Sequence, residues 1–146
     1  MSGDTDPLAI ALFSEILMAG QLARNRLSRA LPKGMELSHF SVLNHLAHTK
    51  RDRSPAQLAE TFHVTRGAMT NTLSKLEQSG HIHIRPDWED HRRKIVTIST
   101  AGRAALQSAL AGMAPVLDDM VSGVGREGIR AALPVLRNIR ARFEPE

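Results

Sequence analysis

Hydrophobic positions along this chain recur mostly with helical spacing, and they divide it into six expected helices. These helices are expected at 7–31, 38–48, 55–62, 65–79, 100–122 and 126–143. A period of two replaces helical spacing at 81–85, where Ile82 and Ile84 share a side, and at 95–99, where Val96 and Ile98 share a side. This predicts two strands joined by a long polar tip. The pattern therefore predicts a mainly α-helical fold with one β-hairpin.

Local signals agree with these boundaries. Ser54 stands before Pro55 and three residues before Gln57, which predicts a capping box with proline at the first helical position. Thr65 can cap the next helix, and Gly80 stands where a left-handed C-terminal cap belongs. Two short helices, a tight turn and a hairpin together predict a winged helix-turn-helix.

The helix expected at 65–79 has one apolar face and one polar face of small and hydrogen-bonding residues. Arg66 can donate two hydrogen bonds to guanine, Asn71 can pair with adenine, and Thr70 can contact a thymine methyl or a phosphate. Gly67 and Ser74 keep this face low enough for close approach. A face of this kind is typical of a helix that enters the DNA major groove.

The tip of the expected hairpin, residues 86–94, is rich in charge. An arginine on such a loop can lie in the narrow minor groove, where the potential is most negative. We assign that role to Arg92, with Asp90 fixing its guanidinium by a hydrogen bond. The full set of expected DNA contacts is Ser54, Thr65, Arg66, Gly67, Thr70, Asn71, Ser74, Lys75, Asp90, Arg92, Arg93 and Lys94.

Composition narrows the class of protein. The 146 residues carry a net charge of +4, and nine basic against six acidic residues lie between positions 50 and 94, so the positive excess lies in the middle of the chain. The absence of cysteine excludes disulfides and thiol-based redox sensing. No signal sequence is evident, and no apolar run approaches the length of a membrane span, so we expect a soluble, cytoplasmic protein.

Several motifs in order resemble the MarR family of bacterial regulators. They read VTRGAMT at 64–70, LEQSGHI at 76–82, DWEDHRR at 87–93 and ISTAGR at 98–103. Trp88, His91 and Ser99 depart from the residues usual in the family, and His91 leaves the tip one charge less basic. The resemblance implies a winged-helix DNA-binding transcription regulator: a homodimeric, ligand-responsive repressor on a pseudo-palindromic operator, associated with the nucleoid when bound.

In that arrangement residues 1–35 and 100–146 form the dimer and residues 36–99 form the DNA-binding head. The apolar surplus at 8–17 and in the last two helices agrees, since one small head does not need it. Pro115 and Pro134 should bend those two helices. The resemblance also implies a small aromatic effector between the dimer helices and the head. By position Met18, Phe40, Asn44 and Met113 are candidate lining residues, although ordinary core packing explains each of them better.

The sequence also bears on three alternative functions: a metal site, an enzyme and a winged helix that contacts only protein. The pairs His45/His48 and His81/His83 suggest a metal site, although neither matches a common zinc spacing, so we expect no metal or other cofactor. An enzyme is disfavoured because the chain lacks a phosphate-binding glycine loop, HExxH and GxSxG. A winged helix used only for protein contact is disfavoured by the polar helix face and the basic tip.

Overall fold

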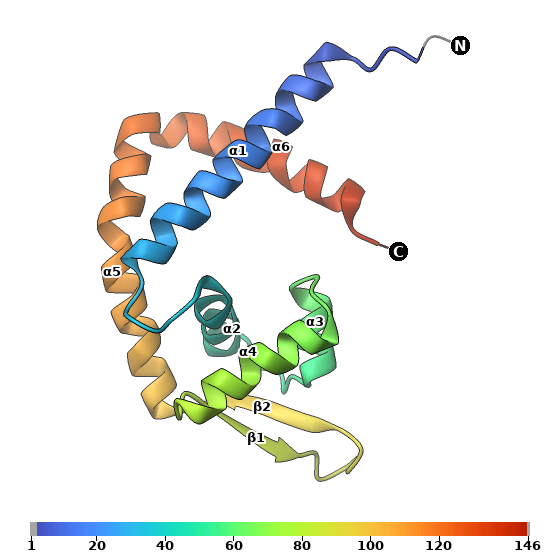
Figure 1. Cartoon of the computed structure of the whole chain (residues 1–146), viewed down its shortest axis with the longest axis vertical. Helices are drawn as coiled ribbons and strands as arrows, with labels where there is room; N and C mark the ends of the chain where they lie inside the picture. Colours follow the sequence, from blue (N-terminus) through green and yellow to red (C-terminus); the bar gives the residue numbers. More distant parts are fainter. Residues whose placement is uncertain (1–2, 146) are drawn as a thin grey trace.

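The computed structural model describes residues 3–145 as six helices and one antiparallel hairpin (Figure 1). The elements are α1 (Pro7–Ala30), α2 (Leu37–His48), α3 (Pro55–Thr61), α4 (Arg66–Gln78), β1 (Ile82–Pro86), β2 (Lys94–Ile98), α5 (Thr100–Val124) and α6 (Arg126–Phe143). The predicted fold class is confirmed, and element boundaries agree with the sequence analysis to within about two residues. Both α5 and α6 continue through their internal prolines, and α5 follows a curved path (Figure 1).

Side-chain caps determine where several helices begin. Ser54 Oγ accepts the N–H of Gln57 at 3.2 Å, and Gln57 Oε1 accepts the N–H of Ser54 at 3.0 Å, which completes the predicted capping box. Thr65 Oγ1 accepts the N–H of Ala68 at 3.1 Å at the start of α4. Between α3 and α4, His63 adopts a positive φ of 53°, which lets the chain reverse within a few residues.

The hairpin pairs Ile82 with Ile98 and Ile84 with Val96, so these four side chains share the face toward the helices. A further backbone hydrogen bond runs from the N–H of Val96 to the carbonyl of Arg53 at 2.8 Å. The sequence analysis placed Arg53 in a charged loop. It missed this bridge because a single paired residue leaves no alternating pattern. The bridge attaches the start of α3 to the hairpin.

One hydrophobic core holds the head together, and it includes a residue of α5. Its buried members are Val42, Leu43, Leu46, Leu58, Ala59, Met69, Leu73, Leu76, Ile82, Val96 and Leu106. A second, smaller cluster of Leu31, Ala109 and Met113 joins α1 to α5. The first half of α5 therefore packs within the head, although the sequence analysis assigned all of 100–146 to the dimer.

Two glycines allow backbones to come close to α5. A Cβ at Gly102 would collide with the carbonyl of His81, and a Cβ at Gly112 would collide with the carbonyl of Ala30. At the first junction Ser99 Oγ donates to the carbonyl of Gly80 at 2.6 Å and accepts the N–H of Gly102 at 2.9 Å. The end of α4, the start of β1 and the start of α5 are thereby tied together.

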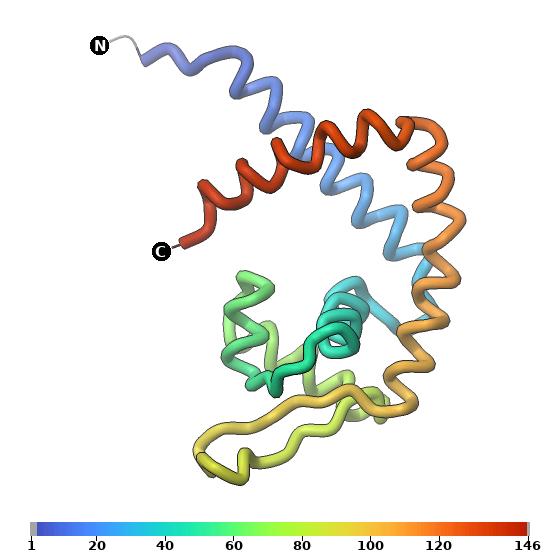
Figure 2. The backbone as a smooth tube through the Cα atoms, turned by 180° about the vertical axis from the view of Figure 1, so that it is seen from behind, coloured from blue at the N-terminus to red at the C-terminus, as the bar shows by residue number. Residues whose placement is uncertain are grey.

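The far end of the molecule is apolar and open. α1 extends away from the head, whereas α6 turns back toward it, and neither helix has a buried residue (Figure 2). Of the fifteen large hydrophobic side chains exposed within residues 3–145, thirteen lie on α1, α5 or α6. By length and composition α1 could also cross a membrane, which the sequence analysis did not expect because polar residues interrupt its apolar run. The exposed apolar surface is not limited to α1, however, but continues onto α5 and α6.

Candidate nucleic-acid interface

A basic hollow lies between the start of α3, the exposed side of α4 and the tip of the hairpin. Its lining residues are Ser54, Pro55, Ala56, Arg66, Thr70, Arg92, Arg93 and Lys94. Six of the twelve expected DNA-contact residues are brought together here, and four of those six carry positive charge. A hollow of this composition favours a phosphate-rich ligand.

Ser54 and Thr65 hold helices in place rather than offering free hydroxyls. Ser54 is only 7% exposed, and its oxygen is engaged with Gln57. Thr65 is exposed, but its oxygen accepts the N–H of Ala68. Their direct effect is to position the N-termini of α3 and α4, whose unpaired N–H groups and helix dipoles favour an anion.

The outward face of α4 carries the predicted polar residues. Arg66, Thr70, Asn71 and Ser74 are exposed on it, whereas Met69, Leu73 and Leu76 on the opposite side are buried. A Cβ at Gly67 would meet nothing within 4 Å, so no contact inside the protein requires glycine there. Ala68, expected on the apolar face, is exposed because it lies at the edge of the buried stripe.

Lys75 lies on a different flank of α4 from the basic hollow. Its Nζ is 3.9 Å from Oε1 of Glu36, at the start of α2, and both side chains are about half exposed or more. An exposed pair at this distance contributes little to stability. The structure therefore separates Lys75 from Arg66 and Thr70, which the sequence analysis had grouped with it.

The hairpin tip is ordered by its own hydrogen bonds. Asp90 Oδ1 accepts both the N–H and the Nε–H of Arg92, each at 3.1 Å. The N–H of Arg93 donates to the carbonyl of Asp90, and the N–H of Asp87 donates to the carbonyl of Arg93, each at 2.9 Å. The Arg92 side chain is held by Asp90 yet remains 92% exposed, so it is available to a partner.

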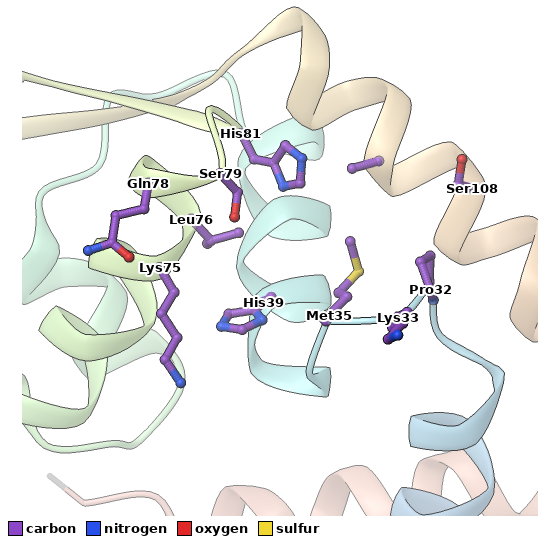
Figure 3. A pocket seen from close by; sticks show the side chains of 12 residues that line it. Pro32, Lys33, Met35, His39, Lys75, Leu76, Gln78, Ser79, His81 and Ser108 are labelled. Carbon is purple, nitrogen blue, oxygen red and sulfur yellow. The ribbon is translucent and has the colours of Figure 1, made fainter.

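A second hollow, of about 460 Å³, lies between the connection from α1 to α2, the first turn of α2, the end of α4 with the residues that follow it, and α5. Figure 3 shows its lining. Met35, His39, Leu76, His81 and Ser108 are among the residues that line it, and we call it the His39 hollow. The N–H of Glu36 donates to His39 Nδ1 at 3.0 Å, so the neutral ring carries its proton on Nε2. Burial lowers the pKa of His39; Glu36 opposes this, whereas Lys75 and His81 lower the pKa further.

The four residues expected to line an effector site do not line the His39 hollow. Met113 is buried in the α1–α5 cluster, and Phe40 packs against both cores. Met18 is 60% exposed on α1, and Asn44 is half-buried on α2. That His39 and His81 line a common hollow was not predictable, because residues from separate elements form the hollow and no local spacing links them.

The histidine pairs do not form a cluster with other ligands. Within residues 3–145 there is no group of three or more histidine, cysteine, aspartate or glutamate side chains that could hold a metal ion. His48 Nδ1 donates to the carbonyl of Asn44 at 2.7 Å, and His45 packs edge-on against Phe62. Burial lowers the pKa of His45, and the charge of Arg53 lowers it further.

The chain is similar in sequence and structure to bacterial and archaeal regulators. A sequence model of the MarR family matches residues 33–93. The Transcriptional activatory protein BadR of Rhodopseudomonas palustris is 27% identical over 99 residues, covering 66% of this chain and 57% of BadR. The HTH-type transcriptional repressor YetL of Bacillus subtilis is 32% identical over 81 residues, covering 55% of this chain and 48% of YetL. The chain thus spans about half the length of the curated relatives it matches.

Solved structures share the whole fold. The transcriptional regulator BldR from Sulfolobus solfataricus has a TM-score of 0.83 at 26% identity, covering 95% of this chain and all of BldR. Sco3205 from Streptomyces coelicolor, solved in complex with DNA, has a TM-score of 0.86 at 18% identity, covering 98% and 96% of the two chains. CouR from Rhodococcus jostii, solved bound to p-coumaroyl-CoA, has a TM-score of 0.78 at 18% identity, covering 92% and 95%. At 18% identity, the last two comparisons establish the fold alone.

Proposed function

This chain belongs to the MarR family of winged-helix transcriptional regulators, a non-enzyme class, and from that premise we propose that it binds double-stranded DNA sequence-specifically. The basic hollow carries this proposal. It places Arg66 and Thr70 of α4 beside Arg92, Arg93 and Lys94 of the hairpin tip. A phosphate backbone seated there lies between a helix aimed at the major groove and a tip aimed at the minor groove.

Within this proposal α4 reads bases and the tip holds the duplex. Asn71 and Arg66 supply the side chains that distinguish adenine and guanine in the major groove. Gly67 supports this role. No part of the protein lies within 4 Å of a Cβ placed there, and a residue without a side chain lets DNA approach α4 closely. Lys75 takes a lesser part, since its partner is Glu36.

We infer that the chain acts as a homodimer on a pseudo-palindromic operator. The apolar side chains left exposed on α1, α5 and α6 provide a surface that a second copy would cover. α1, α6 and the outer half of α5 form this dimerisation part, and residues 36–99 with the inner half of α5 form the head. Burying α1 against a second copy fits a cytoplasmic protein that associates with the nucleoid when bound.

We further propose repression that a small molecule relieves. YetL is a repressor by name, and CouR was solved with an aromatic ligand. The His39 hollow offers a place for an effector with an apolar ring and an acidic group, because Met35 and Leu76 lie near His81 and the Nε2–H of His39 (Figure 3). Aromatic carboxylates screened by thermal shift test this part: a ligand that binds there should stabilise the protein and lower its DNA affinity.

DNA binding is tested by fluorescence anisotropy with a duplex selected from a random-sequence pool, at several salt concentrations. The wild type should lose affinity steeply as salt rises, because each neutralised phosphate releases counterions. Arg92→Ala should weaken binding by about 1–3 kcal/mol. Arg137→Ala, which removes an exposed arginine of α6, should leave affinity nearly unchanged. Selection of no duplex, or binding that ignores salt, would refute the proposal.

A further inference from the structure

Trp88 stands at the hairpin tip with its side chain in solvent. It is 76% exposed, and it is the one large hydrophobic residue of the hairpin, among residues 82–98, with such exposure. The remaining exposed hydrophobic side chains lie mostly on α1, α5 and α6, at the other end of the molecule. An exposed indole contributes no hydrophobic free energy until a partner covers it, so its burial in a complex would favour binding.

The loop that presents Trp88 is ordered without using the indole. Asp87 Oδ1 accepts the N–H of Glu89 at 3.0 Å, and the backbones of Asp87 and Arg93 are hydrogen-bonded at 2.9 Å. Two of the three carboxylates of the tip are thus engaged within the loop, since Asp90 binds Arg92. The fold keeps Trp88 in place, and folding does not require its side chain.

Trp88 shares its loop with cations that continue into the basic hollow. Arg92, Arg93 and Lys94 follow it by four to six residues and line that hollow with Arg66. A polyanion held by these side chains lies against the tip on which the indole stands. This step rests on the proposed DNA binding. Because the tip continues into the basic hollow, we take the partner that covers Trp88 to be DNA rather than another protein or a second copy of the chain.

We propose that Trp88 packs into the DNA minor groove beside Arg92 and contributes both affinity and a preference for A·T base pairs. The walls of that groove are deoxyribose rings, whose C–H groups suit the flat apolar face of an indole, and apolar side chains inserted there are a known means of binding. The indole Nε1–H can donate to the N3 or O2 acceptors on the groove floor. The guanine amino group obstructs this floor, so Trp88 disfavours G·C pairs beneath the tip.

The chain is suited to a direct test because it has one tryptophan and no tyrosine, so indole emission reports position 88 alone. The full-length protein is titrated with the selected duplex. Emission should shift to shorter wavelength or be quenched, and acrylamide should quench the complex less than the free protein. Unchanged emission and unchanged acrylamide access in the saturated complex would overturn the proposal.

Affinity measurements identify what the indole contacts. Trp88→Ala should weaken binding roughly 5- to 50-fold, within the range for aromatic contacts to nucleic acid, and leave the salt slope unchanged because no charge is lost. Trp88→Phe should retain most of the affinity. Inosine in place of guanine under the tip removes the minor-groove amino group, and it should strengthen binding by the wild type more than by Trp88→Ala.

If Trp88→Ala binds as tightly as the wild type while Asn71→Ala and Arg92→Ala bind weakly, the tip binds DNA without the indole and the inference is wrong. If emission changes on dilution of the protein without DNA, the indole contacts a second copy, and the inference is again wrong. If the wild type selects no duplex, the proposed function itself fails.

Discussion

His39 shows how one side chain can serve two structural purposes. Its Nδ1 caps the start of α2 by accepting the N–H of Glu36, while its ring is 6% exposed and lines a hollow. Both arrangements need the neutral imidazole, because a proton on Nδ1 would remove the acceptor and a buried charge would lose its hydration. Protonation of His39 is therefore coupled to the packing of α2 against the head.

Stability should consequently fall in mild acid. Because the pKa values of His39 and His45 are lowered in the folded state, the unfolded chain binds protons that the folded chain does not. Their contribution is complete above the unfolded pKa of about 6.5 and is lost as pH falls through the lowered folded values. His39→Gln keeps an acceptor for Glu36 and does not titrate, so its melting temperature should change less between pH 7.5 and pH 5.

The matched control is His91→Gln, which alters an exposed histidine of the hairpin tip and should show the pH dependence of the wild type. A pH dependence of His39→Gln as steep as that of the wild type would contradict this account. The measurement is thermal unfolding followed by circular dichroism at each pH.

Residue-level features were predictable where their causes are local. The caps at Ser54 and Thr65 were expected, since each needs only a partner three residues away. The Asp90–Arg92 hydrogen bond was also expected, and it spans two residues. The pairing of Lys75 with Glu36 was not, because the two residues are brought together by the packing of α2 against α4.

At the scale of elements, α5 connects the head to the outer helices through glycines at close backbone approaches. Gly102 lies against the carbonyl of His81, and Gly112 lies against that of Ala30. The helical spacing of α5 was readable from the sequence, including a stripe that is buried at Leu106 and Met113 and exposed at Met120 and Val124. The close approaches were not readable, because a glycine within a helical pattern does not reveal which neighbour it admits.

Gly102→Ala should destabilise the protein by about 1–3 kcal/mol or more, because its methyl group would overlap a backbone carbonyl that cannot rotate away. Gly123→Ala is the control in the same helix. Its Cβ would meet nothing within 4 Å, so this change should be neutral or stabilising by up to about 1 kcal/mol. Urea unfolding of both variants measures the difference. Equal free energies of unfolding for the two variants would show that the carbonyl of His81 can move away from a methyl group at position 102.

The whole molecule has a compact head at one end and an open set of helices at the other. Its fold class was predictable, because alternation, helical spacing and caps each indicate an element from nearby residues. The division at residue 100 stays a prediction. Leu106, beyond that division, packs with the core of the head, and the sequence carried no local sign of this long-range contact.

In solution the protein should behave as a dimer of twice the 16.0 kDa of one chain. Leu17→Glu places a charge at a side chain that is 71% exposed in the single chain, so it should fold yet dissociate. Val64→Glu, at a side chain of the head that is 43% exposed, should remain dimeric. Light scattering coupled to size-exclusion chromatography measures each mass. A monomeric wild type, or a dimeric Leu17→Glu, would contradict the dimer assignment.

Ser99 and Gly102 join the inner end of α5 to the end of α4, so a change in the angle of α5 is passed on to α4. The 25 residues of α5 extend about 37 Å, and its inner end is joined to α4, the helix proposed to read bases. A tilt of α5 by about 10° about its outer end displaces its inner end by roughly 6 Å, nearly two base-pair steps of the duplex. Small angular changes set at the outer helices therefore become large displacements of the head. In a dimer built this way, the tolerance for misaligned half-sites is set by how stiffly α5 holds its angle.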